Sequence, residues 1–364
     1  MSNVERRKVR WVIAHFPVEL FVRTAKAFTD ELEKLCPNQF DIEILTLGEY
    51  MSRYSELYSE EEMKFWKTTT PTIRGLENSY RTIASTDVKE LDTFAKIEKR
   101  WQVFFEAMKN GKFEMSQTQV SIVGTHLHTN FHTIDLPFLF TGHDHVSKAL
   151  DGAIGDRLCA EVGDATGVRG LGFTYSGGYR IIGSTDGITS LKDLSDKKFI
   201  TATHTSNLLF KKIGIEHLTR KSATADDIGD MAEQGGALET TYLRFEGKNI
   251  LKTNHSMFMT SILTSDAFLN TLTAEQQEAF KIAAKRVAKI ERVWSVEDAK
   301  KYEDEAVSRG VTIVDISDED KALLKKSARQ IYQASTLDHA GIDKETVHEI
   351  IKLGLEIDKS HYLG

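Results

Sequence analysis

The chain has 364 residues, which is too long for one small core and long enough for two modest lobes. Hydrophobic residues make up 40% of it and charged residues 28%, the balance of an ordinary globular protein. The formal net charge of −7 argues against a nucleic-acid binder and against docking on an anionic membrane, because both tasks need a basic face.

The N-terminal ten residues are polar and basic, and a short strand-like run follows where a secretory signal would have its apolar region. No stretch is apolar for long enough to cross a bilayer. As written, the sequence is expected to be either a mature form with an added start methionine or a cytoplasmic protein.

The first elements in chain order are a strand, a helix and a second strand. Residues 8–15 alternate in polarity, apolar residues recur at helical spacing over 21–35, and residues 40–47 alternate again. This order is typical of the start of a doubly wound sheet. Residues 49–111 are predicted to be mostly helical and are rich in aromatic side chains.

The middle of the chain predicts a short buried strand at 120–124 (VSIVG) and a helix over 144–162. Residues 167–176 and 179–184 are expected to be consecutive strands. The pair Gly177-Gly178 separates them and relieves steric limits on the backbone, so it is a candidate crossing point between lobes.

The last third predicts strands at 199–203 and 256–264 and then a long helix that begins at Thr273. Its pattern continues to about Arg309, beyond the usual length of a globular helix, so it is long enough to touch both lobes. A strand over 311–316 and two amphipathic helices are expected to close the chain.

This alternation predicts an α/β protein with largely parallel sheets, in a two-lobed periplasmic-binding-protein-like fold with a long helix spanning both lobes. Lobe I is expected to hold residues 1–177 and about 264–300. Lobe II is expected to hold 178–263 and about 301–364. Ligands of such folds bind at the carboxyl ends of strands, here in a cleft between the lobes.

Five sequence blocks follow one another in an order that resembles a known family. In chain order they are IDLPFLF (134–140) with His145 and LDG (150–152), the stretch 167–180 ending in GGYR, ITSLKDL (188–194), GGALE (235–239), and TNH (253–255) ahead of LTAEQQ (272–277). On these blocks the chain is identified as a member of the solute-binding proteins of tripartite ATP-independent periplasmic (TRAP) transporters, with an extra insert at about 50–100.

The resemblance implies a periplasmic protein that captures a small organic ligand, usually an organic acid, by hinge closure. It further implies delivery of the ligand to the membrane permease subunits of the transporter, with no enzymatic activity, no cofactor and no nucleic acid. The alternative on the same fold is a cytoplasmic ligand sensor or partner-binding module. In that alternative the aromatic insert would be the partner surface, although buried packing explains the aromatics more simply.

Arg180 matches the family arginine after the glycine pair and is the first candidate ligand contact. A guanidinium presents a fixed fork of donors that suits a carboxylate, and it keeps its charge; an arginine on a surface strand is the alternative. The principal carboxylate-binding arginine of the family falls on Ile200, and a proline of the family falls on Ala202. Lys198 is a weak substitute on the same strand face. This departure favours a smaller or less charged solute, or other donors.

Polar residues beyond that strand are further candidates. Thr203, Thr205 and His204 offer hydroxyls and a neutral imidazole to a hydroxylated or amide-like ligand, whereas a solvent-exposed loop is the alternative for His204. Glu239 and Thr240 could accept hydrogen bonds from ligand hydroxyls or from an ammonium, or could cap a neighbouring helix.

His126 and His128 are expected on the loop after the 120–124 strand, lining the cleft, with surface histidines as the alternative. A metal-dependent hydrolase that uses these histidines is a third class of function. Zinc needs three or four converging donors, and this spacing matches no strong zinc motif, so no metal site is predicted.

Overall fold

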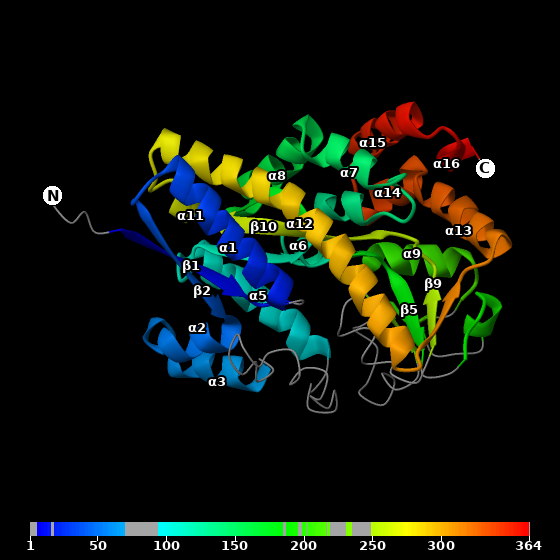
Figure 1. The fold of residues 1–364 in the computed structure, drawn as a ribbon, viewed down its shortest axis with the longest axis horizontal. Coiled ribbons are helices and arrows are strands. Elements are labelled where there is room, and N and C mark those ends of the chain that lie inside the picture. The colour runs from blue at the N-terminus through cyan, green and yellow to red at the C-terminus, as the bar shows by residue number, and fades with distance from the viewer. Residues whose placement is uncertain are drawn as a thin grey trace.

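The computed structural model describes residues 6–15, 18–69, 94–184, 187–195, 199–201, 203–215, 217–218, 231–234 and 249–363. Within these residues two sheets lie toward the two ends of an elongated molecule, with helices packed around both (Figure 1). The first sheet has the strand order β2-β1-β3-β10-β4. Its strands are β1 (Arg7–Ile13), β2 (Phe40–Thr46), β3 (Met115–Gln119), β4 (Val168–Tyr179) and β10 (Met257–Ser265).

The second sheet, in the described part of the chain, has the order β11-β9-β5-β8-β6-β7. Its strands are β5 (Ile181–Ser184), β6 (Phe199–Ile200), β7 (His217–Leu218), β8 (Met231–Gln234), β9 (Asn249–Lys252) and β11 (Thr312–Asp315). The α/β class is confirmed, but both sheets are mixed. β10 runs antiparallel to β3 and β4, and β5 runs antiparallel to β8 and β9. Each follows directly on a strand of the other sheet, so no helical crossover precedes it.

Helices cover both sheets. They are α1 (Val18–Leu35), α2 (Leu47–Arg53), α3 (Glu60–Thr69), α5 (Phe94–Lys109), α6 (Val120–His126), α7 (His143–Leu150), α8 (Ala153–Thr166), α9 (His204–Lys212), α11 (Asp266–Leu269), α12 (Ala274–Ser308), α13 (Asp318–Ile331), α14 (Ala334–Ala340), α15 (Lys344–Ile357) and α16 (Ser360–Leu363), with 3₁₀ turns η1 (Ser55–Leu57), η3 (Thr129–Asp135) and η4 (Lys192–Leu194). The expectation of two closing helices is wrong, because α13 to α16 all follow β11.

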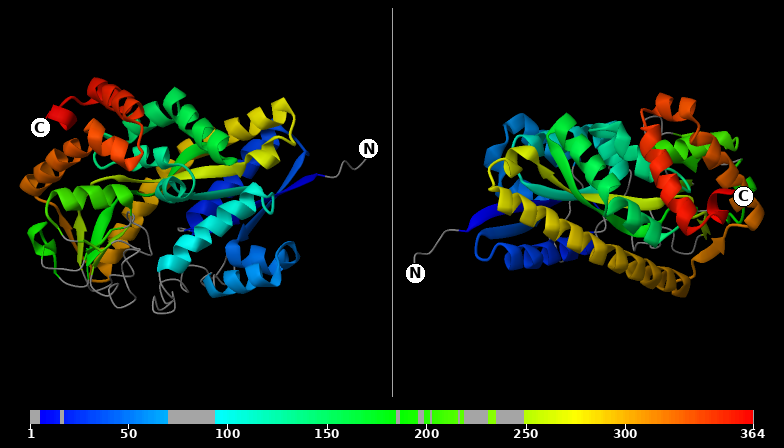
Figure 2. Two further views of the ribbon diagram at one scale, coloured as in Figure 1. Left: turned by 180° about the vertical axis from the view of Figure 1, so that it is seen from behind. Right: turned by 90° about the horizontal axis from the view of Figure 1, so that it is seen from above.

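The long helix α12 is confirmed. Thr273 caps it, and Gln276 completes a reciprocal capping box, which satisfies donors that the first turn leaves free. Its first half packs on α1 and β4, whereas Tyr302 and Ala306 near its end pack with Ile181 of the second sheet. Figures 1 and 2 show the helix running diagonally across the whole molecule. One continuous helix therefore contacts both sheets.

Two further segments cross between the sheets side by side. Arg180 alone separates β4 from β5, and residues 253–256 separate β9 from β10. The Arg180 amide donates to the Ser256 carbonyl oxygen (2.8 Å), which ties the two crossings together. The predicted break at Gly177-Gly178 is wrong in position, because β4 continues through both glycines. Their φ angles of 96° and 87° bend the strand just before the crossing.

The predicted strand at Val120–Gly124 is also wrong. These residues open helix α6, and the strand is the polar segment Met115–Gln119 before it. The strand tolerates polar residues because they bond inside the sheet. Gln117 Nε2 donates to Thr174 Oγ1 (2.9 Å), and Ser116 Oγ donates to the Val12 carbonyl (2.7 Å). A hydrophobic pattern cannot reveal such a strand.

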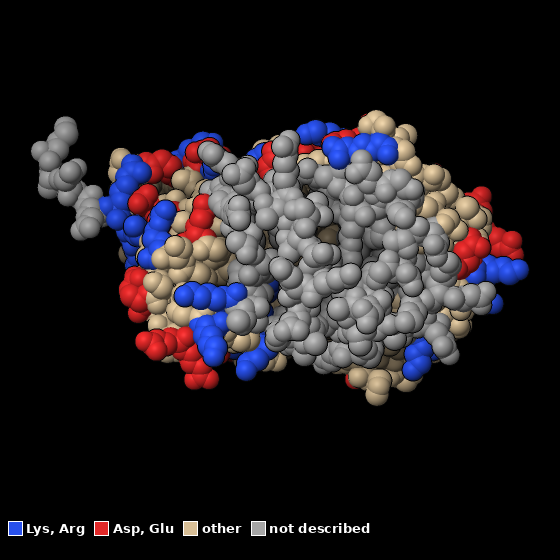
Figure 3. All heavy atoms as spheres, turned by 90° about the horizontal axis from the view of Figure 1, so that it is seen from below, with Lys and Arg blue, Asp and Glu red and all other residues tan. Residues whose placement is uncertain are grey.

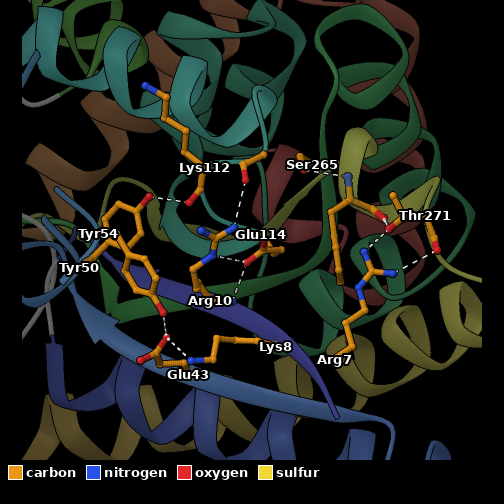
Figure 4. A network of polar contacts seen from close by, with 12 residues as sticks. Arg7, Lys8, Arg10, Glu43, Tyr50, Tyr54, Lys112, Glu114, Ser265 and Thr271 are labelled. Atoms are coloured by element: carbon orange, nitrogen blue, oxygen red, sulfur yellow. Dashed lines mark hydrogen bonds and ion pairs between the residues drawn. The ribbon is translucent and has the colours of Figure 1, made fainter. Parts of the chain in front are cut away.

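The aromatic segment 50–100 lies in the core where the structure describes it. Tyr50, Tyr58 and Trp66 are buried, and the Tyr50 hydroxyl donates to the Lys112 carbonyl (2.5 Å). Figure 4 shows this tyrosine beside the ion pair of Arg10 and Glu114. The ion pair connects strand β1 to the residue that precedes strand β3. Residues 70–93 lie outside the described residues.

Charged side chains of both signs are intermixed at the two ends of the face seen in Figure 3, where described residues are visible. Neither end of this face carries charges of only one sign, which agrees with the modest negative net charge. Among the helices of the described residues, none has the length and apolar character that a bilayer span requires.

Gly155, at the start of α8, provides a test of the packing. A Cβ at this position would lie 2.0 Å from the Leu150 carbonyl oxygen, a backbone atom that cannot move aside cheaply. We expect Gly155→Ala to lower the free energy of unfolding by about 1 to 3 kcal/mol in urea titrations, as overpacking does. Gly187→Ala is the control, because a Cβ there would have no heavy atom within 4 Å. Equal stability of the two variants would contradict this account.

Candidate ligand-binding site

A buried ion pair lies where the two crossing segments meet. Arg180 Nη2 is 3.1 Å from Asp135 Oδ1, and both side chains are 0% exposed. The guanidinium carbon also lies 4.4 Å from the ring centre of Phe258 on β10, a favourable cation–π distance. The sequence predicted Arg180 as a candidate but not its partner. The positive charge is therefore balanced by a carboxylate of the same chain.

Helix α9 brings hydroxyl groups to the same carboxylate from the side of the second sheet. Thr205 Oγ1 donates to Asp135 Oδ2 (2.7 Å). The hydroxyl of Thr203 caps the helix by accepting from the Ser206 amide (3.1 Å), and it lies 3.0 Å from the Thr205 hydroxyl. Asp135 follows β3 and α6 along the chain, whereas α9 follows β6. The contact thus joins segments that belong to different sheets.

The polar cluster continues to the other crossing segment. The Ser206 hydroxyl is 3.3 Å from Nε2 of His255, whose Nδ1 is 2.7 Å from the Thr253 hydroxyl. The His255 carbonyl oxygen accepts from the Phe138 amide (2.7 Å), which anchors the LPFLF segment to the crossing. The cluster is thus continuous from η3 through α9 to residues 253–256, and its members are buried.

A second group of polar residues lies at the strand ends of the first sheet. Because β1 and β3 are parallel, their carboxyl ends share one edge. His15 just beyond β1 and Gln119 at the end of β3 meet there, with 2.6 Å between their Nε2 atoms. The His15 ring also contacts Phe258, with 6.3 Å between ring centres, and Phe258 in turn contacts Arg180. This edge therefore adjoins the ion pair.

Two histidines pair near the ion pair. The rings of His132 and His204 are 5.7 Å apart between centres. Burial lowers the pKa of His132 to about 4, partly opposed by the Asp135 charge, and burial also lowers the pKa of His204. Both imidazoles are therefore neutral at pH 7. Gly124 permits this packing, because a Cβ there would lie 2.7 Å from the His132 ring.

The structure brings some predicted site residues together and separates others. Arg180, Thr203 and His204 lie around Asp135, and His204 keeps partial contact with solvent although its ring is desolvated enough to lower its pKa. His126 ends helix α6 and His128 precedes η3, so the expectation of a loop after a strand is wrong for both, because the expected strand is a helix. The Nδ1 atom of His128 is buried without a hydrogen-bond partner among the described residues.

Glu239 and Thr240 lie outside the described residues, as do Lys198 and Ala202. Ile200 is in strand β6. No group of three or more His, Cys, Asp or Glu side chains in the described ranges is placed to hold a metal ion.

The family model of bacterial extracellular solute-binding proteins, family 7, matches residues 99–217 and 245–338, more than half of the chain. This chain belongs to that family. The family 7 protein is therefore a solute-binding protein, as the resemblance implied. The match includes Asp135, Arg180, Thr205 and His255, the core of the polar cluster.

Individual proteins agree with the family 7 assignment. A solute-binding protein of Verminephrobacter eiseniae (strain EF01-2) is 28% identical over 267 residues, which are 66% of this chain and 76% of that protein. The sugar acid binding protein of Advenella mimigardefordensis, solved in complex with galactonate, is similar in fold with a TM-score of 0.70 at 15% identity, covering 98% of this chain and 100% of that one.

A TRAP periplasmic solute-binding protein of Xanthobacter autotrophicus with bound β-D-galacturonate has a TM-score of 0.66 at 20% identity, covering 95% and 99% of the two chains. These likenesses confirm the two-lobed α/β fold.

Asp135, His255 and Phe258 form much of the observed site but were not predicted as site residues of this family 7 protein. One signal was available for Asp135, since a lone acid within the apolar run IDLPFLF must find a partner if the run is buried. No signal in one sequence links it to Arg180, which lies 45 residues later.

Proposed function

We propose that this family 7 protein is the extracytoplasmic binding subunit of a TRAP transporter, which closes around a small organic acid and delivers it to membrane permease subunits. The observation that supports closure is the contact of Thr205 with Asp135. It joins helix α9 of the second sheet to η3 beside the first, at the point where two chain segments cross. A ligand that replaced or extended this contact would favour the state in which the lobes touch.

The balanced charge of Arg180 bears on the class of ligand. An arginine already paired with Asp135 offers less net positive potential to a dianion than a free arginine would. Threonine hydroxyls and neutral imidazoles around the pair suit hydroxyl groups. Relatives of similar fold were solved with galactonate, galacturonate and L-gulonate, which are hydroxylated acids, and another was solved with succinate, a dicarboxylate. We therefore propose a hydroxylated monocarboxylate rather than a dicarboxylate as the ligand.

Calorimetric titration tests this ligand class. Protein freed of retained molecules by unfolding and refolding is titrated with galactonate, gulonate and succinate. We expect at least one hydroxylated acid to bind more tightly than succinate and to shorten the distance between spin labels placed on α8 and α13. Binding of succinate alone would contradict the ligand class, and binding without any distance change would contradict closure.

Thr205→Val is expected to weaken binding of the best acid about tenfold, because a hydrogen bond to a charged group is lost. Thr24→Val is the matched control. Its hydroxyl is equally buried but bonds to Leu20 within helix α1. Equal affinities of the two variants would exclude the Thr205–Asp135 contact from the binding event.

Export is tested separately by fractionating cells that carry the native gene. The proposal predicts the protein in the periplasmic fraction, and recovery with the cytoplasm would favour the ligand-sensor alternative. Deletion of the gene is expected to abolish uptake of the acid that binds the purified protein.

A further inference from the structure

A pocket of about 370 Å³ lies beside the crossing segments, on the face away from the Arg180 guanidinium. Tyr179 lines it and Arg180 does not, as expected for successive residues of an extended chain, which point to opposite faces. The LPFLF segment, residues 254–257, α13 and the C-terminal segment supply the rest of its wall. Neither Arg180 nor Asp135 lines the pocket, although His255 belongs both to its wall and to the polar cluster.

The apolar part of the wall is held in an unusual backbone geometry. Phe138 and Asn254 have φ angles of 54° and 46°, a region that residues with side chains rarely adopt. Hydrogen bonds fix Phe138 on both sides. Its amide donates to the His255 carbonyl (2.7 Å), and its carbonyl oxygen lies 2.8 Å from Nε2 of His361. The pocket is a built feature, held open by contacts from three segments.

The polar part of the wall carries an excess of positive charge. Lys321 and Lys325 lie one turn apart on α13 and both line the pocket. Burial lowers the pKa of Lys325, and the nearby charge of Lys321 lowers it further. The single acid of the described wall, Asp358, already accepts hydrogen bonds from the Ser360 amide and hydroxyl. An anion bound here would relieve the repulsion between the two lysines.

We propose that this pocket is a second binding site, specific for a small carboxylate that carries an apolar group. The carboxylate would lie between Lys321 and Lys325, and the apolar group would pack against Leu136, Leu139 and Met257, which line the same pocket. Because the crossing segments form part of the wall, an occupant also biases their relative position. An occupant of the pocket then changes the affinity of the proposed ligand site for its acid. A bound acid changes the affinity of the pocket by the same factor.

The probe is 4-fluorobenzoate, titrated to ~10 mM and followed by fluorine NMR, with 4-fluorobenzyl alcohol as its uncharged counterpart. We expect the benzoate to bind more tightly than the alcohol. The double variant Lys321→Gln/Lys325→Gln should weaken benzoate binding about tenfold. Lys326→Gln, on the same helix but outside the pocket wall, is the matched control and should change it less than about twofold.

Absence of benzoate binding, equal loss in Lys326→Gln, or equal affinity for the alcohol would overturn the second site. If excess galactonate displaces the benzoate and Thr205→Val also weakens benzoate binding, the probe binds at the Asp135 cluster. That result would also overturn the second site. Failure of every sugar acid to bind would contradict the proposed function but not the second site, because the benzoate titration does not depend on the sugar acids.

Discussion

Replacing Arg180 with methionine is expected to lower the free energy of unfolding by about 3 to 5 kcal/mol. Methionine approximates the length of the arginine stem but leaves the Asp135 carboxylate fully buried without the cation that balances it. A buried charge that has lost its partner is far more costly than a pair replaced as a whole. Urea unfolding at neutral pH, followed by circular dichroism, measures the loss.

A double-mutant cycle with Asp135→Asn separates the pair from other effects of each side chain. We expect the double variant to be more stable than the sum of the two single losses implies, because each removes the partner of the other. Strict additivity would contradict the pairing. Arg157→Met is the matched control. Its bond to Glu349 (2.6 Å) is largely exposed, so its loss should stay within about 1 kcal/mol.

Glu291→Gln is expected to make the protein more stable at alkaline pH and to leave its stability near pH 4 almost unchanged. Glu291 is a fully buried acid on α12. Its Oε2 accepts from the Tyr175 amide (2.8 Å), and Gln117 Nε2 lies 3.4 Å from its Oε1. Burial raises the pKa of Glu291 to about 8, and these hydrogen bonds offset the effect only in part. The folded protein therefore holds a proton that the unfolded chain releases.

The direction of the pH dependence follows from that proton. Between the ordinary glutamate pKa of 4.5 and about 8 the folded state binds more protons than the unfolded state, so stability falls as pH rises. The expected loss over this window is on the order of 5 kcal/mol. Glutamine resembles the protonated acid, and its amide oxygen can accept the hydrogen bond from the Tyr175 amide.

Unfolding free energies at several pH values, measured for the native chain and for Glu291→Gln, provide the test. The unfolding free energy should fall more steeply with rising pH in the native chain than in Glu291→Gln. Glu278→Gln, which makes the same charge change at an exposed position of the same helix, should keep the native slope. A native-like slope in Glu291→Gln would show that Glu291 ionises normally. The raised pKa would then be wrong.

The sequence predicted those parts of the fold that local chemistry determines. Thr273 and Gln276 form the capping box of the long helix, and alternating apolar residues mark β1 and β2. It failed where tertiary contacts override the local pattern. The apolar run from Val120 is a helix, and the polar run before it is a central strand, since its side chains hydrogen-bond with neighbouring strands. Periodicity alone does not distinguish a short buried helix from a buried strand.

The candidate site was predicted only in part for a similar reason. Arg180, Thr203 and His204 were identified by family position or residue type. Asp135 and His255 acquire their roles from the crossing of segments that are far apart in the sequence. The departure from the family pattern that was predicted at Ile200 concerns one residue, but its consequence would depend on the balance of charge in the site. That balance became visible only with the pairing of Arg180.

The order of strands has a consequence for how the chain acquires its structure. In the first sheet β10 lies between β3 and β4, and β4 has no other neighbour among the described strands. Residues 1–180 alone would therefore lack the strand that attaches β4, and a fragment beginning at β5 would carry β10 with nothing to pair it. The first sheet can form completely only after the chain has been synthesised as far as Ser265, where β10 ends. The protein is thus expected to unfold in one cooperative step and to yield no stable half on limited proteolysis.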